Sequence, residues 1–138
     1  MMYAHGHGVP KDYEKARQWY ERAAAQGDMT AQYNLGLLYA DGVGVPQDYK
    51  KARQLWEQAA AQGDAKAQNN LGSMYENGEG VPQDYVLAYM WYSLAVEHWT
   101  DNPQKFAADN RVRVAGRMTP AQIAEAQTLA REWAPKSK

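Results

Sequence analysis

Apolar residues recur along the chain at the spacing of amphipathic helices. Between residues 31 and 40 they follow i, i+4, i+7, i+8 spacing, which places them on one face of a helix. These positions are Ala31, Leu35, Leu38 and Tyr39. After residue 46, a second stretch carries its own apolar face, made of Tyr49, Ala52, Trp56, Ala59 and Ala60. The pattern predicts an all-α protein built from pairs of short helices, each with one apolar face.

The helix pair belongs to a unit that repeats every 36 residues. The dipeptide Val-Pro occurs at positions 9, 45 and 81, and each copy is followed, after one residue, by Asp-Tyr. Residues 9–28 match residues 45–64 at 15 of 20 positions, and residues 29–44 match residues 65–80 at 8 of 16. Because a helix pair cannot bury its apolar face alone, stacked pairs are expected to form a solenoid.

The ends of the predicted helices carry residues with known capping preferences. Asp48 stands near the first turn of the second stretch, where a carboxylate can cap the helix and meet the positive end of its dipole. Gly42 follows the first stretch and can adopt the left-handed conformation of a helix stop. Gly36 and Gly72 are expected to let helix backbones approach closely, with Tyr and Trp rings filling the gaps.

The sequence after residue 85 departs from the repeat. Residues 85–99 carry almost no charge, so this helix is expected to be buried on more than one face. The expected cover is a helix over about residues 104–115 and another over about 120–133. Thr119 and Gln122 form a capping box, with Pro120 at the first helical position. The C-terminal segment is therefore predicted to cap the solenoid.

Composition narrows the classes of function. The chain has 138 residues, a formal net charge of −1 and no cysteine. Near-neutral charge argues against a strong electrostatic grip on nucleic acid or an anionic membrane. The lack of cysteine excludes a disulfide scaffold, a thiolate zinc site and a cysteine nucleophile. No apolar run reaches the length of a membrane span, and the polar start does not fit a secretory signal, so we expect a soluble protein.

No set of residues points to catalysis, a cofactor or a metal site. The acidic residues lie in repeated turns or on expected helix surfaces, where caps and solvated faces explain them. His5 and His7 would need a further ligand, such as Asp12, to hold a metal, and exposed loop residues are the simpler interpretation. His98 is expected to be a packed or capping residue. The Tyr and Trp residues could stack on bases, but they recur at core positions of the repeat, which favours packing.

One repeat unit carries small and aromatic residues at fixed spacing. Residues 31–63 read Ala-x3-Leu-Gly-x2-Tyr-x2-Gly-x-Gly-Val-x2-Asp-x2-Lys-Ala-x3-Trp-x2-Ala-Ala-x2-Gly. This motif resembles the Sel1-like repeat, a relative of the 34-residue tetratricopeptide repeat. The resemblance covers about residues 1–100. It implies one domain with a partial repeat at 1–28, Sel1-like repeats at 29–64 and 65–100, and capping helices at 101–138.

The resemblance implies a right-handed superhelical solenoid of antiparallel helix pairs. Such proteins act mostly as adaptors or scaffolds for protein complexes, often in bacterial signalling and envelope processes. We therefore expect a non-enzymatic adaptor with a protein or peptide partner and no cofactor. One alternative is a self-associating structural array. Another is a small-ligand-binding or hydrolase-like role, as in a cysteine-rich branch linked to β-lactam compounds, which this cysteine-free chain does not match.

The same resemblance implies where a partner would bind. In the tetratricopeptide fold the first helix of each pair lines a concave groove, and positions outside the repeated core face it. These positions are Thr30, Tyr33, Asn34, Leu37 and Asp41 in one repeat and Lys66, Asn69, Asn70, Ser73 and Asn77 in the next. Most of them differ between the copies, which suits a recognition surface and equally suits plain solvent exposure. The repeated asparagine, Asn34 and Asn70, could hydrogen-bond a partner's backbone or orient its own helix.

The first repeat lacks most of its first helix, because residues 1–4 align with residues 37–40. We expect a piece of a longer array, in preference to a chain that naturally begins here. If the chain is such a piece, a periplasmic or secreted location is expected. If it is not, a cytoplasmic location is expected. In both cases the helix with Tyr13, Trp19 and Tyr20 lacks its usual neighbour, so its apolar end is expected to seek a partner or form a homo-oligomer.

Overall fold

The computed structural model describes residues 10–99 and 104–133, and this part of the chain consists of seven α-helices without a strand. In chain order they are α1 (Pro10–Ala25), α2 (Met29–Asp41), α3 (Tyr49–Ala61), α4 (Ala65–Asn77), α5 (Tyr85–His98), α6 (Gln104–Ala115) and α7 (Pro120–Glu132). The predicted helices match these bounds closely, and α2 begins two residues earlier than the apolar pattern indicates.

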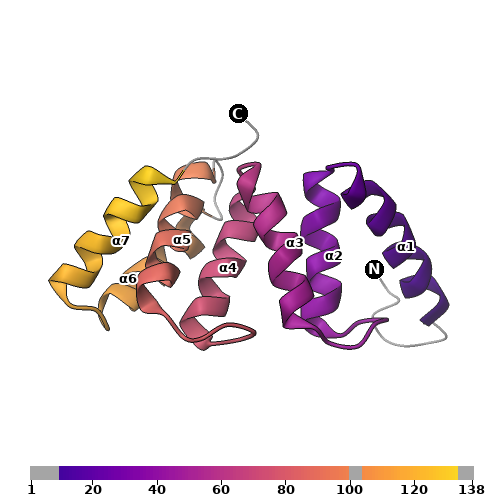
Figure 1. Ribbon diagram of the computed structural model, residues 1–138, viewed down its shortest axis with the longest axis horizontal. Coiled ribbons are helices and arrows are strands. Elements are labelled where there is room, and N and C mark those ends of the chain that lie inside the picture. Colours follow the sequence, from indigo (N-terminus) through magenta and orange to yellow (C-terminus); the bar gives the residue numbers. More distant parts are fainter. Residues whose placement is uncertain (1–9, 100–103, 134–138) are drawn as a thin grey trace.

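The helices form an elongated row, with α1 at one end and α6 and α7 at the other (Figure 1). From α1 to α5, short loops join neighbours that run in opposite directions, and each helix packs against the next. α5 packs against three helices, namely α4, α6 and α7. The predicted all-helical solenoid is confirmed, and so is the prediction that the C-terminal helices cover the apolar helix α5.

Aspartate residues begin four of these helices. The Asp48 carboxylate accepts a hydrogen bond from the backbone N–H of Lys51 at 3.0 Å, as predicted for the start of α3. Asp28, Asp64 and Asp84 cap α2, α4 and α5 in the same way. Each cap satisfies a backbone donor that the helix itself cannot, which contributes about 1 kcal/mol. The repeated Asp residues are therefore structural, as the sequence indicates.

Two further end signals are confirmed. The Thr119 hydroxyl accepts from the Gln122 N–H at 3.1 Å, while the Gln122 side chain accepts from the Thr119 N–H at 2.9 Å. These two bonds form the predicted capping box of α7. Gly42 ends α2 with φ of 69°, and its N–H donates to the Leu38 carbonyl. A side chain with a Cβ would be strained in this left-handed conformation.

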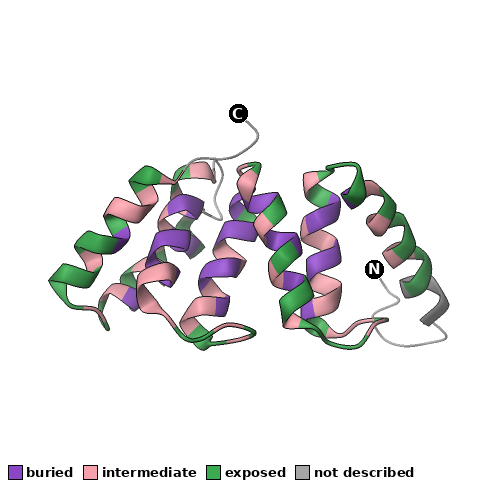
Figure 2. Ribbon diagram, in the orientation of Figure 1, coloured by how far each residue is buried: buried purple, intermediate pink, exposed green. Residues whose placement is uncertain are grey.

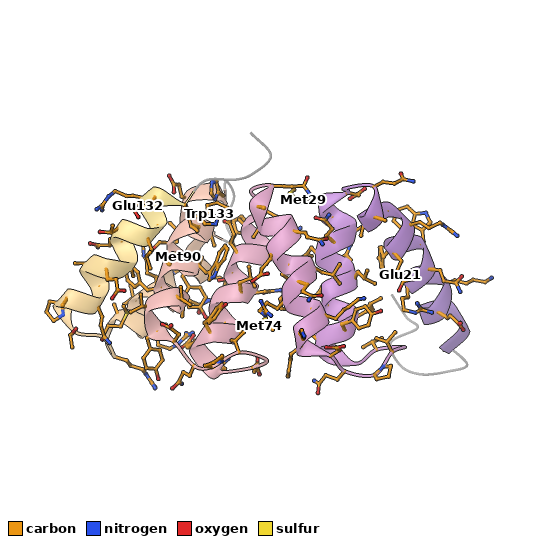
Figure 3. All side chains as sticks on the ribbon, in the orientation of Figure 1. Glu21, Met29, Met74, Met90, Glu132 and Trp133 are labelled. Atoms are coloured by element: carbon orange, nitrogen blue, oxygen red, sulfur yellow. The ribbon has the colours of Figure 1, made fainter. Side chains whose placement is uncertain are left out.

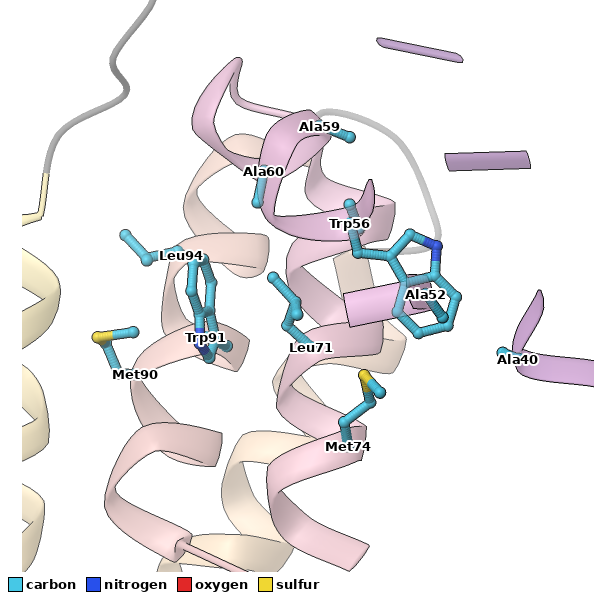
Figure 4. Packing of buried hydrophobic residues seen from close by; sticks show 11 residues of the cluster. Ala40, Ala52, Trp56, Ala59, Ala60, Leu71, Met74, Met90, Trp91 and Leu94 are labelled. Atoms are coloured by element: carbon cyan, nitrogen blue, oxygen red, sulfur yellow. The ribbon is translucent and has the colours of Figure 1, made fainter. Parts of the chain in front are cut away.

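The largest apolar cluster extends through α3, α4 and α5 (Figure 4). Trp56, Leu71, Met74 and Leu94 are each at most 4% exposed. Three alanines of α3, which are fully buried, let the helix axes approach closely: Ala52, Ala59 and Ala60. Buried residues accordingly concentrate in the middle of the row, whereas α1 and α7 are mostly exposed or half-buried (Figure 2).

Aromatic contacts join the residue that follows α7 to α5. The rings of Trp91 on α5 and Trp133 after α7 meet edge to face, with centroids 5.6 Å apart. The His98 ring packs against the Trp133 ring, with centroids 6.2 Å apart, and the Nδ1 atom of His98 lies 3.0 Å from the Gln68 side-chain oxygen. His98 is thus the packed residue that the sequence predicts.

At the other end of the described row, α1 carries an exposed tryptophan. Trp19 is 56% exposed, whereas the residues at the equivalent positions of the next two units, Leu55 and Trp91, are each 8% exposed. Leu55 belongs to an apolar cluster that also contains Ala24 of α1 and residues of α2, so helices that precede α3 contribute to its burial. The exposed apolar position that the sequence predicts on this helix is confirmed at Trp19. Tyr20 is half-buried against an apolar cluster, and the Tyr13 side chain lies outside the described residues.

Candidate protein-interaction groove

A hollow of about 230 Å³ lies between α2 and α4, the first helices of consecutive units. Its buried lining residues are Ala40, Trp56 and Met74, and Met74 lies near the end of α4 in Figure 3. More exposed residues complete the lining, namely Leu37, Asp41, Tyr49, Asn70, Ser73 and Glu79. α3 packs against both α2 and α4, and its Tyr49 and Trp56 side chains reach the space between them. The hollow is therefore produced by the stacking of two units.

A second group of predicted residues meets around the Tyr33 ring. The Lys66 ammonium lies over this ring, 5.2 Å from its centroid, in a cation–π contact between α2 and α4. The Trp56 ring lies 6.5 Å from the Tyr33 ring, and the Trp56 indole N–H donates to the Tyr33 carbonyl at 3.1 Å. Burial raises the pKa of Tyr33, while a hydrogen bond with the Asn70 amide opposes this shift. These contacts hold Tyr33 and Asn70 together beside the hollow.

Asn69 belongs to a different contact, between α4 and α6. Its side-chain oxygen accepts a hydrogen bond from the Asn110 amide at 3.1 Å, and Asn110 in turn accepts from Arg113 at 3.0 Å. Arg113 also makes a two-pronged ion pair with Glu76 of α4, at 2.7 and 2.8 Å. These bonds fasten the capping helix α6 to the last full unit, so Asn69 is engaged within the chain.

Glu76 is the electrostatic centre of this attachment. Besides the Arg113 guanidinium, its carboxylate accepts a hydrogen bond from the Tyr92 hydroxyl at 2.7 Å. The hydrogen bonds from Arg113 lower the pKa of Glu76. The hydrogen bond from Tyr92 and the charge of Arg117 also lower it, whereas burial opposes this shift. Burial and the neighbouring carboxylate of Glu76 raise the pKa of Tyr92. Glu76 is therefore held ionised and Tyr92 protonated.

We expect Glu76→Gln to destabilise the protein by about 1 kcal/mol at neutral pH. The effect is modest because Arg113 is 49% exposed and water screens the pair. A carboxyl with a lowered folded-state pKa stabilises the fold fully above its unfolded pKa of about 4.3, and this contribution is lost as the pH falls through the folded pKa. The difference between wild type and variant should therefore shrink below about pH 4.

Urea denaturation followed by circular dichroism at neutral and acidic pH measures this difference. Glu125→Gln, at an exposed position of α7, is the control and should leave the stability nearly unchanged at neutral pH. A Glu76→Gln effect of the same size at both pH values would contradict the assigned charge pair.

The structure brings only some of the ten predicted groove residues to the hollow. Leu37, Asp41, Asn70 and Ser73 line the hollow. Tyr33 and Lys66 lie beside it, and Asn69 faces α6. Thr30 and Asn77 are exposed near the ends of α2 and α4, and Asn34 is half-buried on α2. The binding of a partner by these residues stays a prediction.

Sequence reasoning missed five contributors to the hollow. Ala40 and Met74 lie at buried positions of α2 and α4. Tyr49 and Trp56 come from the second helix of the pair, where the repeat pattern assigns them to the core alone. Glu79 comes from the loop after α4, at the position that Val43 occupies in the preceding unit. The change from valine to a charged residue between the two glycines of this loop is the sequence signal that could have identified Glu79.

The described residues offer little for catalysis. A second, more open hollow of about 510 Å³ lies between α5, α6 and α7, and its lining includes Ser93, Glu97, Arg111 and Arg131. The buried Ser93 hydroxyl has no hydrogen-bond partner among the described residues, so no base activates it there. No group of three potential metal ligands occurs in the described part of the chain, and His5, His7 and the Asp12 side chain lie outside it.

No helix within residues 10–99 and 104–133 combines the length and hydropathy that a membrane crossing requires. This finding agrees with the sequence, which has no apolar run of that length.

Comparison with known proteins connects the repeat to a family. The family model described as Sel1 repeat matches residues 1–28, 30–64 and 65–98. A crystal structure of a protective antigen from uropathogenic Escherichia coli strains, which displays an SLR fold, is 35% identical with a TM-score of 0.82. The match covers 87% of this chain and 25% of that protein. The search of curated proteins finds no match.

A Sel1 repeat protein from Oxalobacter formigenes is also 35% identical, with a TM-score of 0.66. That match covers 95% of this chain and 54% of the Oxalobacter protein. The chain thus spans a quarter of the first solved structure and about half of the second.

Proposed function

Because the chain belongs to the Sel1 repeat family, we propose that it is a non-enzymatic adaptor that binds a segment of a protein partner between α2 and α4. Proteins of this family generally serve as scaffolds for protein–protein interactions. The hollow between the two helices is the observation that carries the proposal for this chain. Its mixture of apolar and polar lining suits side chains and backbone of a bound segment.

The size of the hollow supports a peptide over a small molecule. Its volume of about 230 Å³ is below the range of about 300–1,000 Å³ that is typical of pockets for drug-sized ligands. One large side chain fits such a space, since a cavity of about 150 Å³ holds a benzene molecule. The remaining affinity would come from contacts along α2 and α4. We expect a dissociation constant in the micromolar range, which corresponds to a binding free energy of about −8 kcal/mol.

Selection from a displayed library of random peptides tests the proposal. Selected peptides are labelled, and their affinity is measured by fluorescence polarisation. In the variant Leu37→Ser/Asn70→Ala, affinity should fall at least about tenfold, because both side chains line the hollow. Asn69 is unsuitable for this test, because it is bonded to Asn110.

Gln54→Ala/Gln58→Ala provides the matched control, since both glutamines are exposed on α3 and neither lines the hollow. This variant should bind as wild type does, and thermal melting should confirm that both variants fold. A library without binders, or equal affinity of wild type and the Leu37/Asn70 variant, would show the groove proposal to be wrong.

A second candidate function is self-association through α1, which the exposure of Trp19 favours. A stacked neighbour could cover this ring as preceding helices cover Leu55. Size-exclusion chromatography with light scattering distinguishes the candidates: a dimer that Trp19→Ser converts to a monomer would support self-association. A wild-type monomer at high concentration would contradict it.

A further inference from the structure

The hollow between α2 and α4 carries two carboxylates and no positive side chain. Asp41 and Glu79 are among its lining residues, whereas none of its described lining residues is Lys, Arg or His. Neither carboxylate takes part in an ion pair within the described part of the chain, where the four ion pairs involve other residues. A ligand that enters the hollow therefore meets two carboxylates without an ion-pair partner in the described part of the chain. Lys66, which lies beside the hollow, is placed over the Tyr33 ring.

The helices add to this charge. Asp41 is the last residue of α2, and Glu79 follows Gly78, the C-terminal cap of α4. A helix C-terminus carries a partial negative charge, so each carboxylate lies at the end of a helix where a cation would be favoured. An acidic residue at this place costs α2 a few tenths of a kcal/mol up to about 1 kcal/mol unless a cation accompanies it. The equivalent residue at the end of α4 is the neutral Asn77.

The remaining lining supplies an apolar environment beside these charges. Leu37 and Met74 offer flexible apolar side chains, and the indole of Trp56, which is only 4% exposed, also lines the hollow. A long basic side chain has the matching composition, with a stem of methylene groups and a charged end. Its stem would bury against Leu37 and Met74, and its charged end would remain near Asp41, which is exposed to water.

We propose that the hollow receives one lysine or arginine side chain of the protein partner, with the charged end between Asp41 and Glu79. The proposal rests on the proposed function, since it names the chemistry of the segment that the groove would bind. Asn70 and Ser73, which also line the hollow, can accept further hydrogen bonds from an ammonium or guanidinium group. The partner segment would thus be basic at its anchoring position.

The test uses short model peptides of defined composition and the complete chain. The probes are acetyl-Ala-Ala-Lys-Ala-Ala-amide and the same peptide with norleucine, which keeps an apolar chain of similar length but lacks the charge, or with glutamate. Each peptide is titrated into the isotope-labelled protein, and the backbone amide signals of Leu37, Asn70 and Ser73 are followed by NMR. We expect the lysine peptide to shift these signals with an affinity about tenfold higher than that of the norleucine peptide.

The decisive variant is Asp41→Asn/Glu79→Gln, which removes both charges and keeps the size of the side chains. It should fold as wild type does, because the next unit already has asparagine, Asn77, at the position equivalent to Asp41. Its affinity for the lysine peptide should fall about tenfold, to that of the norleucine peptide. The control Asp109→Asn/Glu125→Gln changes the net charge equally at exposed positions on α6 and α7 and should leave the affinity within about twofold.

The outcomes separate this inference from the proposed function. If the lysine and norleucine peptides bind equally well and shift the same signals, the groove binds peptides but the basic anchor is wrong. Unchanged lysine affinity in the Asp41/Glu79 variant would overturn the anchor in the same way. If none of the three peptides shifts signals of α2 or α4, the anchor is overturned, whereas the display selection still decides the proposed function separately.

Discussion

Replacement of Trp56 by alanine is expected to lower the free energy of unfolding by about 3–5 kcal/mol. Trp56 belongs to the largest apolar cluster and is 4% exposed. The variant loses the burial of the indole and leaves a cavity at the contact between two units. It also removes the indole N–H that donates to the Tyr33 carbonyl, so that this backbone acceptor loses a partner.

The expected loss is large because Trp56 contributes to the packing of its own unit and to the contact with the next one. Its side chain packs within its own unit against α2 and reaches the hollow between α2 and α4. In a solenoid, stability is approximately a sum of the stabilities of single units and of the contacts between neighbours. Loss of Trp56 should weaken both contributions and should make unfolding less cooperative across the row.

Denaturant unfolding monitored by circular dichroism measures the effect. Trp19→Ala is the matched control, since it removes the same side chain from an earlier unit, where 56% of it is exposed. We expect this control to cost less than about 1 kcal/mol. Similar losses for the two variants would mean that Trp56 is not the packing centre that its burial indicates.

The repeat made the fold predictable at the level of single helices. Asp48 and Gly42 indicate where helices begin and end. Both act locally, through hydrogen bonds to residues about one helical turn away. The cover of α5 was also predictable, because a helix of 14 residues with almost no charge cannot face water on every side. Local chemistry and a repeated pattern point to the same structure in these segments.

The candidate site was less predictable because it depends on contacts between units. Asn69 and Asn70 are neighbours in the sequence, yet Asn69 bonds to α6 while Asn70 lines the hollow. Their directions differ by about 100° around the helix, so the surrounding helices decide their roles. The Glu76–Arg113 pair joins residues 37 positions apart, and Arg113 lies beyond the repeat, where no second copy reveals a pattern.

A smaller residue gives the second large effect: Gly36→Ala should destabilise the protein by about 1–3 kcal/mol. Alanine is usually the better helix former, by about 1 kcal/mol, so the direction is opposite to that of helix propensity. A Cβ at residue 36 would overlap the Trp56 indole, which the surrounding core holds in place. The glycine thus sets the distance between α2 and α3.

The cause of this effect can be isolated in the Trp56→Ala background. Without the indole the added methyl group has space, and Gly36→Ala should then stabilise the protein by up to about 1 kcal/mol. Gly72→Ala is the control, because its Cβ would lie 2.7 Å from the Tyr92 ring and does not involve Trp56. It should remain destabilising in both backgrounds. If Gly36→Ala also keeps its sign when Trp56 is absent, the close approach of α2 to that indole is not what selects glycine at this position.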